Sequence, residues 1–251
     1  MALRRPGRYG SFLGPPVPDD CDLVATVRAV AERADQIKVL LTGPIDFATG
    51  GAKGRPQFDL DACCAIVKTA RELGRSAFVH CNGREGLEIA ITAGFDSIEH
   101  GYGMDEECLR KMAGEGIAWT PTLAPVVALR HLPTVVTGLK SETLAQIDGI
   151  LARHAEAIAR AAQLGVTLLC GSDAGSVGVP HGSGLIDEMI LMAAAGVPIE
   201  TVLRGATFAP RLRWGEPTVN LVAGGQFDVI ALRQSPFESS SALRGITRLA
   251  H

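Results

Sequence analysis

The sequence lacks the features that mark several common classes of protein. No apolar run reaches the roughly 18 residues that span a bilayer. The first twenty residues contain arginine, glycine and proline but no apolar stretch of the kind found in secretory signals. Aromatic residues make up only 5% of the 251 residues, and the net charge of −3 includes no basic excess. We therefore expect a cytoplasmic protein that binds neither membranes nor nucleic acid.

Metal-binding and disulfide patterns of cysteine are also missing. The six cysteines include no Cys-x-x-Cys pair, and Cys63 and Cys64 are adjacent. This spacing suits neither a simple disulfide framework nor a zinc knuckle, so we interpret the cysteines as reduced thiols. The six histidines likewise include no His-x-His pair.

The sequence is rich in aliphatic runs that alternate with amphipathic stretches. Hydrophobic residues make up 47% of the chain and charged residues 20%, which is typical of a globular protein. Many of the amphipathic stretches end at a glycine that is followed by an apolar run, which is the pattern of βα units in a parallel sheet. The expected strands are 37–41, 76–80, 96–100, 117–123 and 166–170. A helix over 23–34 is expected before them, and helices over 59–73, 86–93, 105–114 and 141–164 are expected between them. Two further helices (185–195 and 199–206) and a last strand (229–232) are expected to follow.

Four residues with metal-ligand chemistry lie at or near the ends of these strands. His80 and His100 each close an apolar run, Asp173 follows another, and Lys38 lies within the first. Side chains at the carboxyl ends of parallel strands converge, and this donor set suits zinc or a similar metal. An ammonium group cannot bind a metal and is costly to bury. Carboxylation of Lys38 by CO2 would instead give a carbamate that can bridge two metal ions.

Each of these residues also has a plain structural interpretation. A histidine at a strand end is often only hydrogen-bonded, a strand lysine can reach solvent, and Asp173 can cap a turn. The coincidence of four such residues favours the metal site. The glycine-rich loop 43–58 lacks the order of a phosphate-binding loop, so we expect a lid over the site. A barrel that binds phosphorylated metabolites without a metal is the competing enzyme, and the turn 171–176 supports it weakly.

The same residues occur in motifs that resemble a known family. The segments are Ile37-Lys38-Val39, His80-Cys81-Asn82-Gly83, Ser97-Ile98-Glu99-His100-Gly101, Gly171-Ser172-Asp173-Ala174-Gly175 and the stretch 221–232. In order and type they resemble the amidohydrolase superfamily, and within it the imidazolonepropionase and Xaa-Pro dipeptidase (prolidase-like) branch. The resemblance covers roughly residues 23 to 235.

The resemblance implies a role for each candidate residue. Lys38 would be the carboxylated bridging ligand, and His80 and His100 would bind the more exposed of up to two zinc or other divalent ions. Asp173 would bind the more buried ion and act as the catalytic acid and base, while a metal-activated hydroxide attacks an amide, cyclic amide or dipeptide. His181 and Tyr102 would contact the substrate or support the ligands. Glu188 is expected to be an ordinary helix carboxylate.

The sequence departs from the family pattern at its start. The family's first barrel strand ends in His-x-His, and residue 23 already corresponds to the helix before the fourth strand. The expected fold is therefore a partial TIM-type (β/α)8 barrel over residues 1–215 that lacks the first three strands. Residues 216–251 would form a remnant of the small β-sandwich. We expect a weak buried metal site and a poorly active chain, or a non-catalytic fragment or subunit completed by a partner chain or by a second copy.

Overall fold

The structure is a computed structural model, and the residues that it describes are 2–218, 223 and 229–248. At its centre lies a parallel sheet of five strands in the order β1-β2-β3-β4-β5. The strands are β1 (Ala2–Leu3), β2 (Gln36–Leu40), β3 (Ser76–Cys81), β4 (Ser97–His100) and β5 (Ala118–Thr120). The parallel βα arrangement predicted from the sequence is therefore confirmed.

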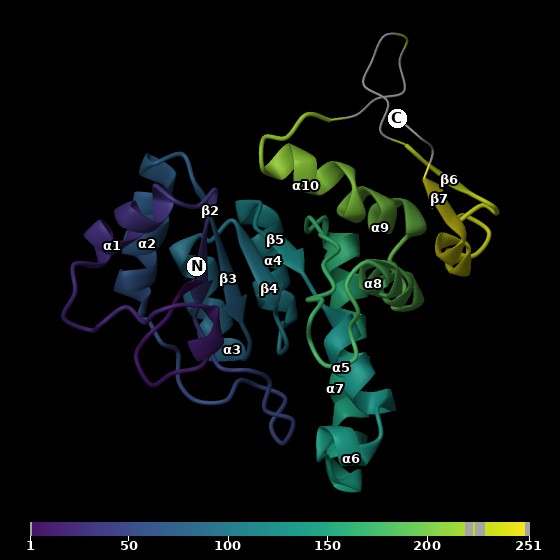
Figure 1. Ribbon diagram of the computed structural model, residues 1–251, viewed down its shortest axis with the longest axis horizontal. Coiled ribbons are helices and arrows are strands. Elements are labelled where there is room, and N and C mark those ends of the chain that lie inside the picture. The colour runs from purple at the N-terminus through teal and green to yellow at the C-terminus, as the bar shows by residue number, and fades with distance from the viewer. Residues whose placement is uncertain (1, 219–222, 224–228, 249–251) are drawn as a thin grey trace.

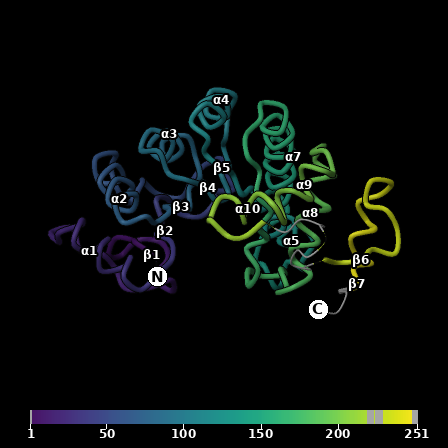
Figure 2. Tube along the Cα trace, turned by 90° about the horizontal axis from the view of Figure 1, so that it is seen from above, coloured from purple at the N-terminus to yellow at the C-terminus, as the bar shows by residue number. Residues whose placement is uncertain are grey.

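Helices cover one face of the sheet. Four of them connect successive strands, namely α1 (Leu23–Ala31), α2 (Leu60–Glu72), α3 (Arg84–Ala93) and α4 (Glu106–Glu115). Figure 2 shows α2, α3 and α4, together with α7 (Ser141–Leu164), in a row along the outer side of the strands. The carboxylates of Asp22, Asp59 and Asp105 accept a backbone N–H at the starts of α1, α2 and α4. These caps satisfy donors that a helix cannot satisfy itself, which explains why the helices begin where they do.

The alternation of side chains along the strands divides core from site. Ile37 and Val39 of β2 pack against the helices in the main hydrophobic core, whereas Lys38 and Leu40 point to the opposite face. The register pairs Leu40 with His80 and pairs His80 with Glu99 on β4. The face away from the helices therefore carries the polar residues.

The remaining helices form a second part of the molecule beside the sheet (Figure 1). They are α5 (Leu123–His131), α6 (Thr134–Thr137), α8 (Ser183–Ala194), α9 (Ile199–Ala206) and α10 (Phe208–Arg213). Two 3-10 helices, Ser11–Leu13 and Ser240–Gly245, complete the helical elements of the described residues. In those residues, no helix combines the length and the apolar character needed to cross a membrane.

A small antiparallel pair, β6 (Ile230–Leu232) and β7 (Ile246–Arg248), follows these helices. The strand expected over 229–232 is thus present, but most of the family-like stretch 221–232 lies outside the described residues. The proposed division into residues 1–215 and 216–251 stays a prediction.

Three of the expectations about strands need correction. The predicted strand 166–170 is reduced to one parallel bridge between Trp119 and Leu168. The predicted strand 117–123 ends at Thr120, because the chain turns at Thr122 into α5. In addition, β1 pairs with β2 through two residues, so a strand does precede the helix at residue 23. Two residues are too few to give a periodic signal in a sequence.

Candidate active site

His80 and His100 come together at the carboxyl end of two adjacent strands. Their ring centroids are 4.5 Å apart, and the rings meet edge to face. Together with Asp173 and Tyr102 they line a pocket of about 150 Å³. A wider cavity of about 600 Å³ is lined by the same two histidines and Asp173, and by Lys38. The structure thus gathers the four predicted ligands and Tyr102 around two cavities that share His80, His100 and Asp173.

The His80 side chain is neutral and its orientation is fixed. Its Nε2 lies 3.1 Å from the carbonyl oxygen of Gly43. Because a carbonyl only accepts, Nε2 carries the hydrogen and Nδ1 keeps its lone pair. Burial lowers the pKa of His80 to about 4, against a smaller rise from the Gly43 bond, and nearby Lys38 lowers the pKa further. A neutral imidazole with one nitrogen hydrogen-bonded to a carbonyl is the usual form of a metal-binding histidine.

Both the ring and the backbone of His100 are fixed by contacts with neighbouring residues. Its Nδ1 lies 2.6 Å from Thr122 Oγ1, and the indole Nε1 of Trp119 donates to its carbonyl oxygen at 2.9 Å. Burial lowers the pKa of His100 well below its ordinary value, and the nearby His80 and Lys38 add to that effect. The ring is therefore neutral as well, and its Nε2 has no part in the Thr122 contact.

Backbone strain is concentrated at this pocket. Among the described residues, the non-glycine residues with positive φ are His100 (69°), Thr122 (53°) and Asp173 (51°). All three line the same pocket. A left-handed conformation costs a residue with a side chain about 1–2 kcal/mol, most for a β-branched residue such as Thr122. Strain of this kind gathers at functional sites, where the surrounding structure enforces it.

Lys38 lies in the middle of β2 and on the same face of the sheet as His80. It pairs with Phe78, two residues before His80, and so lies closer to the amino end of the sheet. Its ammonium group is 4.5 Å from the centroid of the Phe78 ring. Burial lowers the pKa of Lys38, while the carboxylates of Glu99 and Asp173 act in the opposite direction. Lys38 also lines a cavity of about 900 Å³ at the amino end of the sheet. It therefore lies between this cavity and the one that contains the two histidines.

The remaining predicted site residues differ in their positions. Asp173 is exposed and accepts a hydrogen bond from Ser176 Oγ at 3.1 Å. Tyr102 is buried, and its hydroxyl donates to the carbonyl oxygen of Thr122 at 3.3 Å. His181 is exposed in the turn before α8 and is not among the residues that line the two cavities of the site. Its expected contact with substrate stays a prediction.

Comparison with known proteins identifies the family of the chain. The model of the amidohydrolase family matches residues 10–215 of the chain. The chain belongs to the amidohydrolase family.

Known relatives and structures show how much of an amidohydrolase is present. The chain is 28% identical to an uncharacterized protein of Mycobacterium tuberculosis over 244 residues, which cover 96% of this chain and 64% of that protein. It is 28% identical to the ochratoxinase of Aspergillus niger over 215 residues, or 82% of this chain and 43% of that enzyme. A crystal structure of a Xaa-Pro dipeptidase with bound methionine superposes with a TM-score of 0.79 at 25% identity, covering 98% of this chain and 64% of that one. The chain therefore spans less than two thirds of the length of these relatives.

The donor set of the amidohydrolase chain fits a metal ion only in part. Within the described ranges, no group of three or more His, Cys, Asp or Glu side chains is arranged to hold a metal. The two neutral imidazoles offer Nδ1 of His80 and Nε2 of His100, and Lys38 lines the same cavity. A carbamate on Lys38 would add the third oxygen or nitrogen donor that a catalytic zinc site needs. The fit therefore rests on the modification of Lys38.

One residue that lines the candidate site and one that packs behind it went unnoticed in the sequence. Tyr9, in the loop after β1, lines both cavities, and its ring centroid is 5.1 Å from that of His80. Burial and the nearby Asp173 raise the pKa of its hydroxyl. His154 of α7 is buried against Tyr102, with ring centroids 3.7 Å apart, and its Nε2 donates to the Pro121 carbonyl at 3.0 Å. Neither residue belongs to a motif, so no sequence signal pointed to them.

The expectation for Glu188 was wrong. Its side chain is completely buried, and its two oxygens accept the backbone N–H groups of Leu123 and Ala124. A signal for this burial was present, because Leu185, Leu191 and Met192 lie three or four residues away and place Glu188 on an apolar helix face.

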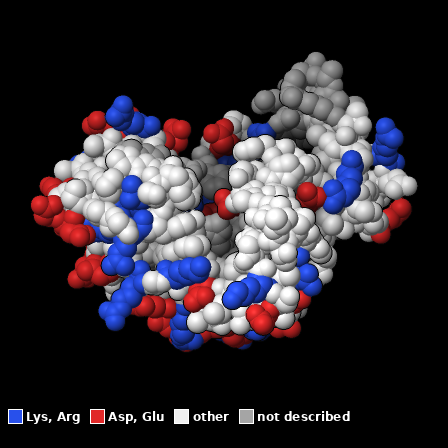
Figure 3. Space-filling view, turned by 60° about the horizontal axis from the view of Figure 1, so that its bottom comes forward, with Lys and Arg blue, Asp and Glu red and all other residues white. Residues whose placement is uncertain are grey.

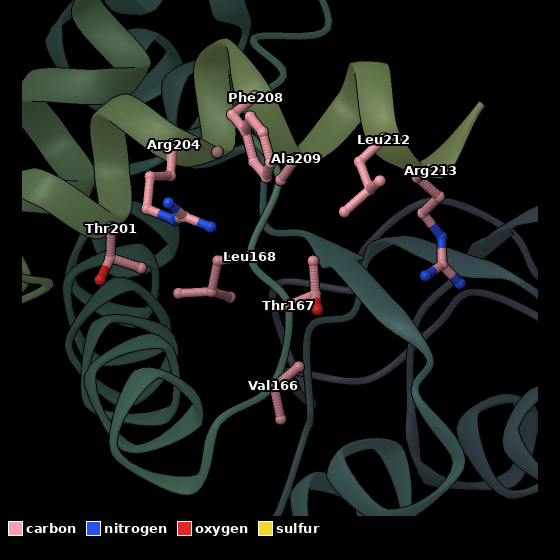
Figure 4. A pocket seen from close by; sticks show the side chains of 10 residues that line it. Val166, Thr167, Leu168, Thr201, Arg204, Phe208, Ala209, Leu212 and Arg213 are labelled. Atoms are coloured by element: carbon pink, nitrogen blue, oxygen red, sulfur yellow. The ribbon is translucent and has the colours of Figure 1, made fainter. Parts of the chain in front are cut away.

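The surface around the amidohydrolase site is hollowed. Figure 3, with the lower side of Figure 1 turned toward the viewer, shows a recess between the sheet and the helices α5–α9, and charges of both signs scattered around it. A separate pocket of about 300 Å³ lies between 166–168 and the helices α9 and α10 (Figure 4). It is lined by Arg204, Phe208 and Leu212 among others, and none of the predicted site residues reaches it.

Proposed function

We propose that this chain carries the hydrolytic site of a metal-dependent amidohydrolase that cleaves C–N bonds in amides or dipeptides. The chain is similar to a Xaa-Pro dipeptidase and to an ochratoxinase, and these relatives support this substrate class. The observation that carries the proposal is the pair of neutral imidazoles, His80 and His100, whose hydrogen bonds leave one nitrogen of each ring for a ligand in the same cavity.

In this proposal the ligands are Lys38, His80, His100 and Asp173. A neutral amine is the form of lysine that reacts with CO2, and the lowered pKa of Lys38 increases its fraction. A divalent metal in this position supplies an activated water and polarises the carbonyl of the substrate. The buried site of a second ion has fewer ligands in this chain, so we expect it to be weak.

The chain's own residues then move the proton and orient the substrate. Asp173, exposed at the cavity mouth, takes a proton from the attacking water at a carboxylate oxygen and passes it to the leaving nitrogen. Tyr9 stands beside His80 and Asp173, where its hydroxyl can donate to a polar group of the substrate. The apolar residues Ile45, Phe47 and Val126 line the other wall and exclude water.

Metal content per chain tests the proposal. The 251-residue chain is produced with zinc and bicarbonate and assayed by elemental analysis, beside the variants Lys38→Ala, His80→Ala and His100→Ala. We expect about one zinc per chain, and its loss in each variant. His131→Ala, which removes an exposed histidine of α5, is the matched control and keeps its zinc. A folded chain without zinc would contradict the proposal.

A second candidate function is supported by the edges of the sheet. In the described part of the chain, β1 pairs only with β2, and segment 166–170 is bridged only to Trp119. Unpaired strand edges are ready templates for another chain. The chain would then serve as a subunit that needs a partner chain or a second copy to become active. A molecular mass that rises with concentration, measured by light scattering, supports this candidate, and a constant monomer mass excludes self-association.

A further inference from the structure

Glu188 caps a helix that is not its own. It lies on α8, yet its Oε1 accepts from Leu123 N at 2.9 Å and its Oε2 from Ala124 N at 2.7 Å, at the start of α5. A third backbone hydrogen bond comes from Thr122. The first N–H groups of a helix have no partner inside it, so the carboxylate of Glu188 satisfies most of that need.

Because Glu188 caps α5, the side chain of the N-cap residue Thr122 does not have to do so. Thr122 is the N-cap residue of α5, but its side chain makes no hydrogen bond to its own helix. A threonine at this position usually turns its hydroxyl onto the helix N–H groups. Here the hydroxyl lies 2.6 Å from Nδ1 of His100. Capping and ring orientation are thus divided between two residues.

We propose that Glu188 is a positioning residue of the hydrolytic site. By capping α5 it holds Thr122 in the left-handed conformation and leaves the Thr122 hydroxyl for Nδ1 of His100, so that Nε2 is the nitrogen left for a ligand. The inference rests on the proposed function, in which His100 is a metal ligand.

The chemistry of a carboxylate explains why this position holds glutamate. A buried carboxylate without a cation beside it is costly, and burial raises the pKa of Glu188 to about 7 in spite of the backbone hydrogen bonds that lower it. A glutamine of the same size would offer a single acceptor oxygen and would turn its NH2 group toward a backbone N–H. Two neighbouring N–H groups therefore require both oxygens of a carboxylate.

The test compares Glu188→Gln with Asp187→Asn in the full chain at about pH 8, where Glu188, with a pKa of about 7, is a carboxylate. Asp187 is the neighbouring residue on α8 and pairs with Arg244 at the surface, so its variant removes the same charge outside the cap. The imidazole 15N signals of His100 are recorded without metal, and they are assigned by their loss in His100→Gln. In the wild type and in Asp187→Asn we expect one neutral tautomer with its hydrogen on Nδ1. In Glu188→Gln we expect a mixture of tautomers.

Zinc affinity, measured by competition with a chelator, gives a second readout. We expect the dissociation constant to rise by about 10–100-fold in Glu188→Gln, the usual effect of losing a residue that orients a ligand. A variant with a lower melting temperature but an unchanged His100 spectrum and zinc affinity would overturn the inference, because Glu188 would then be only a helix cap. If the wild type binds no zinc, the proposed function fails, and the His100 spectrum alone still decides the role of Glu188.

Two further variants keep the test decisive if Glu188→Gln does not fold. Glu188→Asp keeps the charge but is one methylene shorter, so we expect the same spectral change to a smaller extent. Thr122→Val removes only the hydroxyl and is expected to reproduce the tautomer mixture. An unchanged His100 spectrum in Thr122→Val would overturn the proposed connection from Glu188 to His100.

Discussion

The two ends of the sheet use the same left-handed backbone conformation with different residues. At the amino end, the turns that lead from a helix into the next strand have glycine at this position, as at Gly74 (φ 65°), Gly94 (77°) and Gly116 (69°). At the carboxyl end, glycines such as Gly101 (70°) have a positive φ too, but so do three residues with side chains, His100, Thr122 and Asp173. Glycine adopts this conformation without steric cost, whereas the other three carry strain.

The difference separates what stabilises the fold from what builds the site. A Cβ added to Gly74 or Gly116 would meet nothing within 4 Å, so these turns need glycine only for its backbone. At the carboxyl end the strained residues are held by specific contacts, such as the Trp119 indole on the His100 carbonyl and the Tyr102 hydroxyl on the Thr122 carbonyl. The unstrained glycine turns at the amino end stabilise the fold. This stability offsets the backbone strain of His100, Thr122 and Asp173 at the carboxyl end.

The largest expected effect concerns two buried titratable side chains near the carboxyl end of the sheet, His154 and Glu188. Burial lowers the pKa of His154 to about 4 and raises that of Glu188 to about 7. The stability contributed by His154 is present above pH 6.5 and lost as the pH falls toward 4. The contribution of Glu188 is present below pH 4.5 and lost as the pH rises through 7. Each amounts to about 3 kcal/mol, so in the wild type they offset one another.

Single variants should reveal these opposing slopes. The free energy of unfolding is measured with urea from pH 4 to 7.5. The advantage of the wild type over His154→Phe should shrink by about 3 kcal/mol toward pH 4, and its advantage over Glu188→Gln should shrink by about the same amount toward pH 7.5. Curves parallel to that of the wild type would show that neither group titrates with folding.

The next effect separates the conformation of Thr122 from its hydroxyl. Thr122→Gly keeps the left-handed turn at lower strain but removes the oxygen that contacts His100. We expect zinc to bind about 10–100-fold more weakly, while the free energy of unfolding stays equal or rises. Calorimetry and chelator competition measure the two quantities on one sample. A loss of stability together with unchanged zinc binding would show that Thr122 stabilises the fold and does not support the metal site.

The matching change at the amino end should affect stability alone. Gly116→Ala places a side chain at a φ of 69° in open space, so the expected cost is about 1 kcal/mol of unfolding free energy without any clash. Zinc binding should remain that of the wild type. Weaker zinc binding in Gly116→Ala would show that the two ends are coupled.

The smallest effect is expected for an exposed charge at the carboxyl end. Arg84, at the start of α3, forms ion pairs with Glu88, Asp105 and Glu107. Exposed pairs contribute little, so Arg84→Ala should leave zinc binding and the melting temperature unchanged within error. A measurable loss of zinc would mean that the site extends beyond the buried residues.

Local chemistry made part of this architecture predictable from the sequence. The helices α1, α2 and α4 were predicted because amphipathic stretches alternate with apolar runs, and the structure shows that Asp22, Asp59 and Asp105 cap them from within three residues. His80 and His100 were found because each closes an apolar run that forms a strand. Such signals depend only on neighbours in the chain.

The parts that were missed depend on residues far apart in the sequence. Segment 166–170 is apolar enough for a strand. Within the described residues, however, its β-pairing consists of one bridge, between Leu168 and Trp119. The role of Thr122 depends on Glu188, 66 residues later, and on His100, 22 residues earlier. No local pattern encodes a helix that is capped by another helix.

Lys38 lies between two cavities, so two different small molecules would approach it from opposite ends of the sheet. Substrate would enter from the carboxyl end, where His80, His100 and Asp173 lie. Lys38 also lines the cavity at the amino end, together with Phe78 and Gln36. In our proposal, carbon dioxide therefore has an approach to this side chain that does not cross the cavity where the substrate binds, and a bound substrate would not prevent renewal of the carbamate.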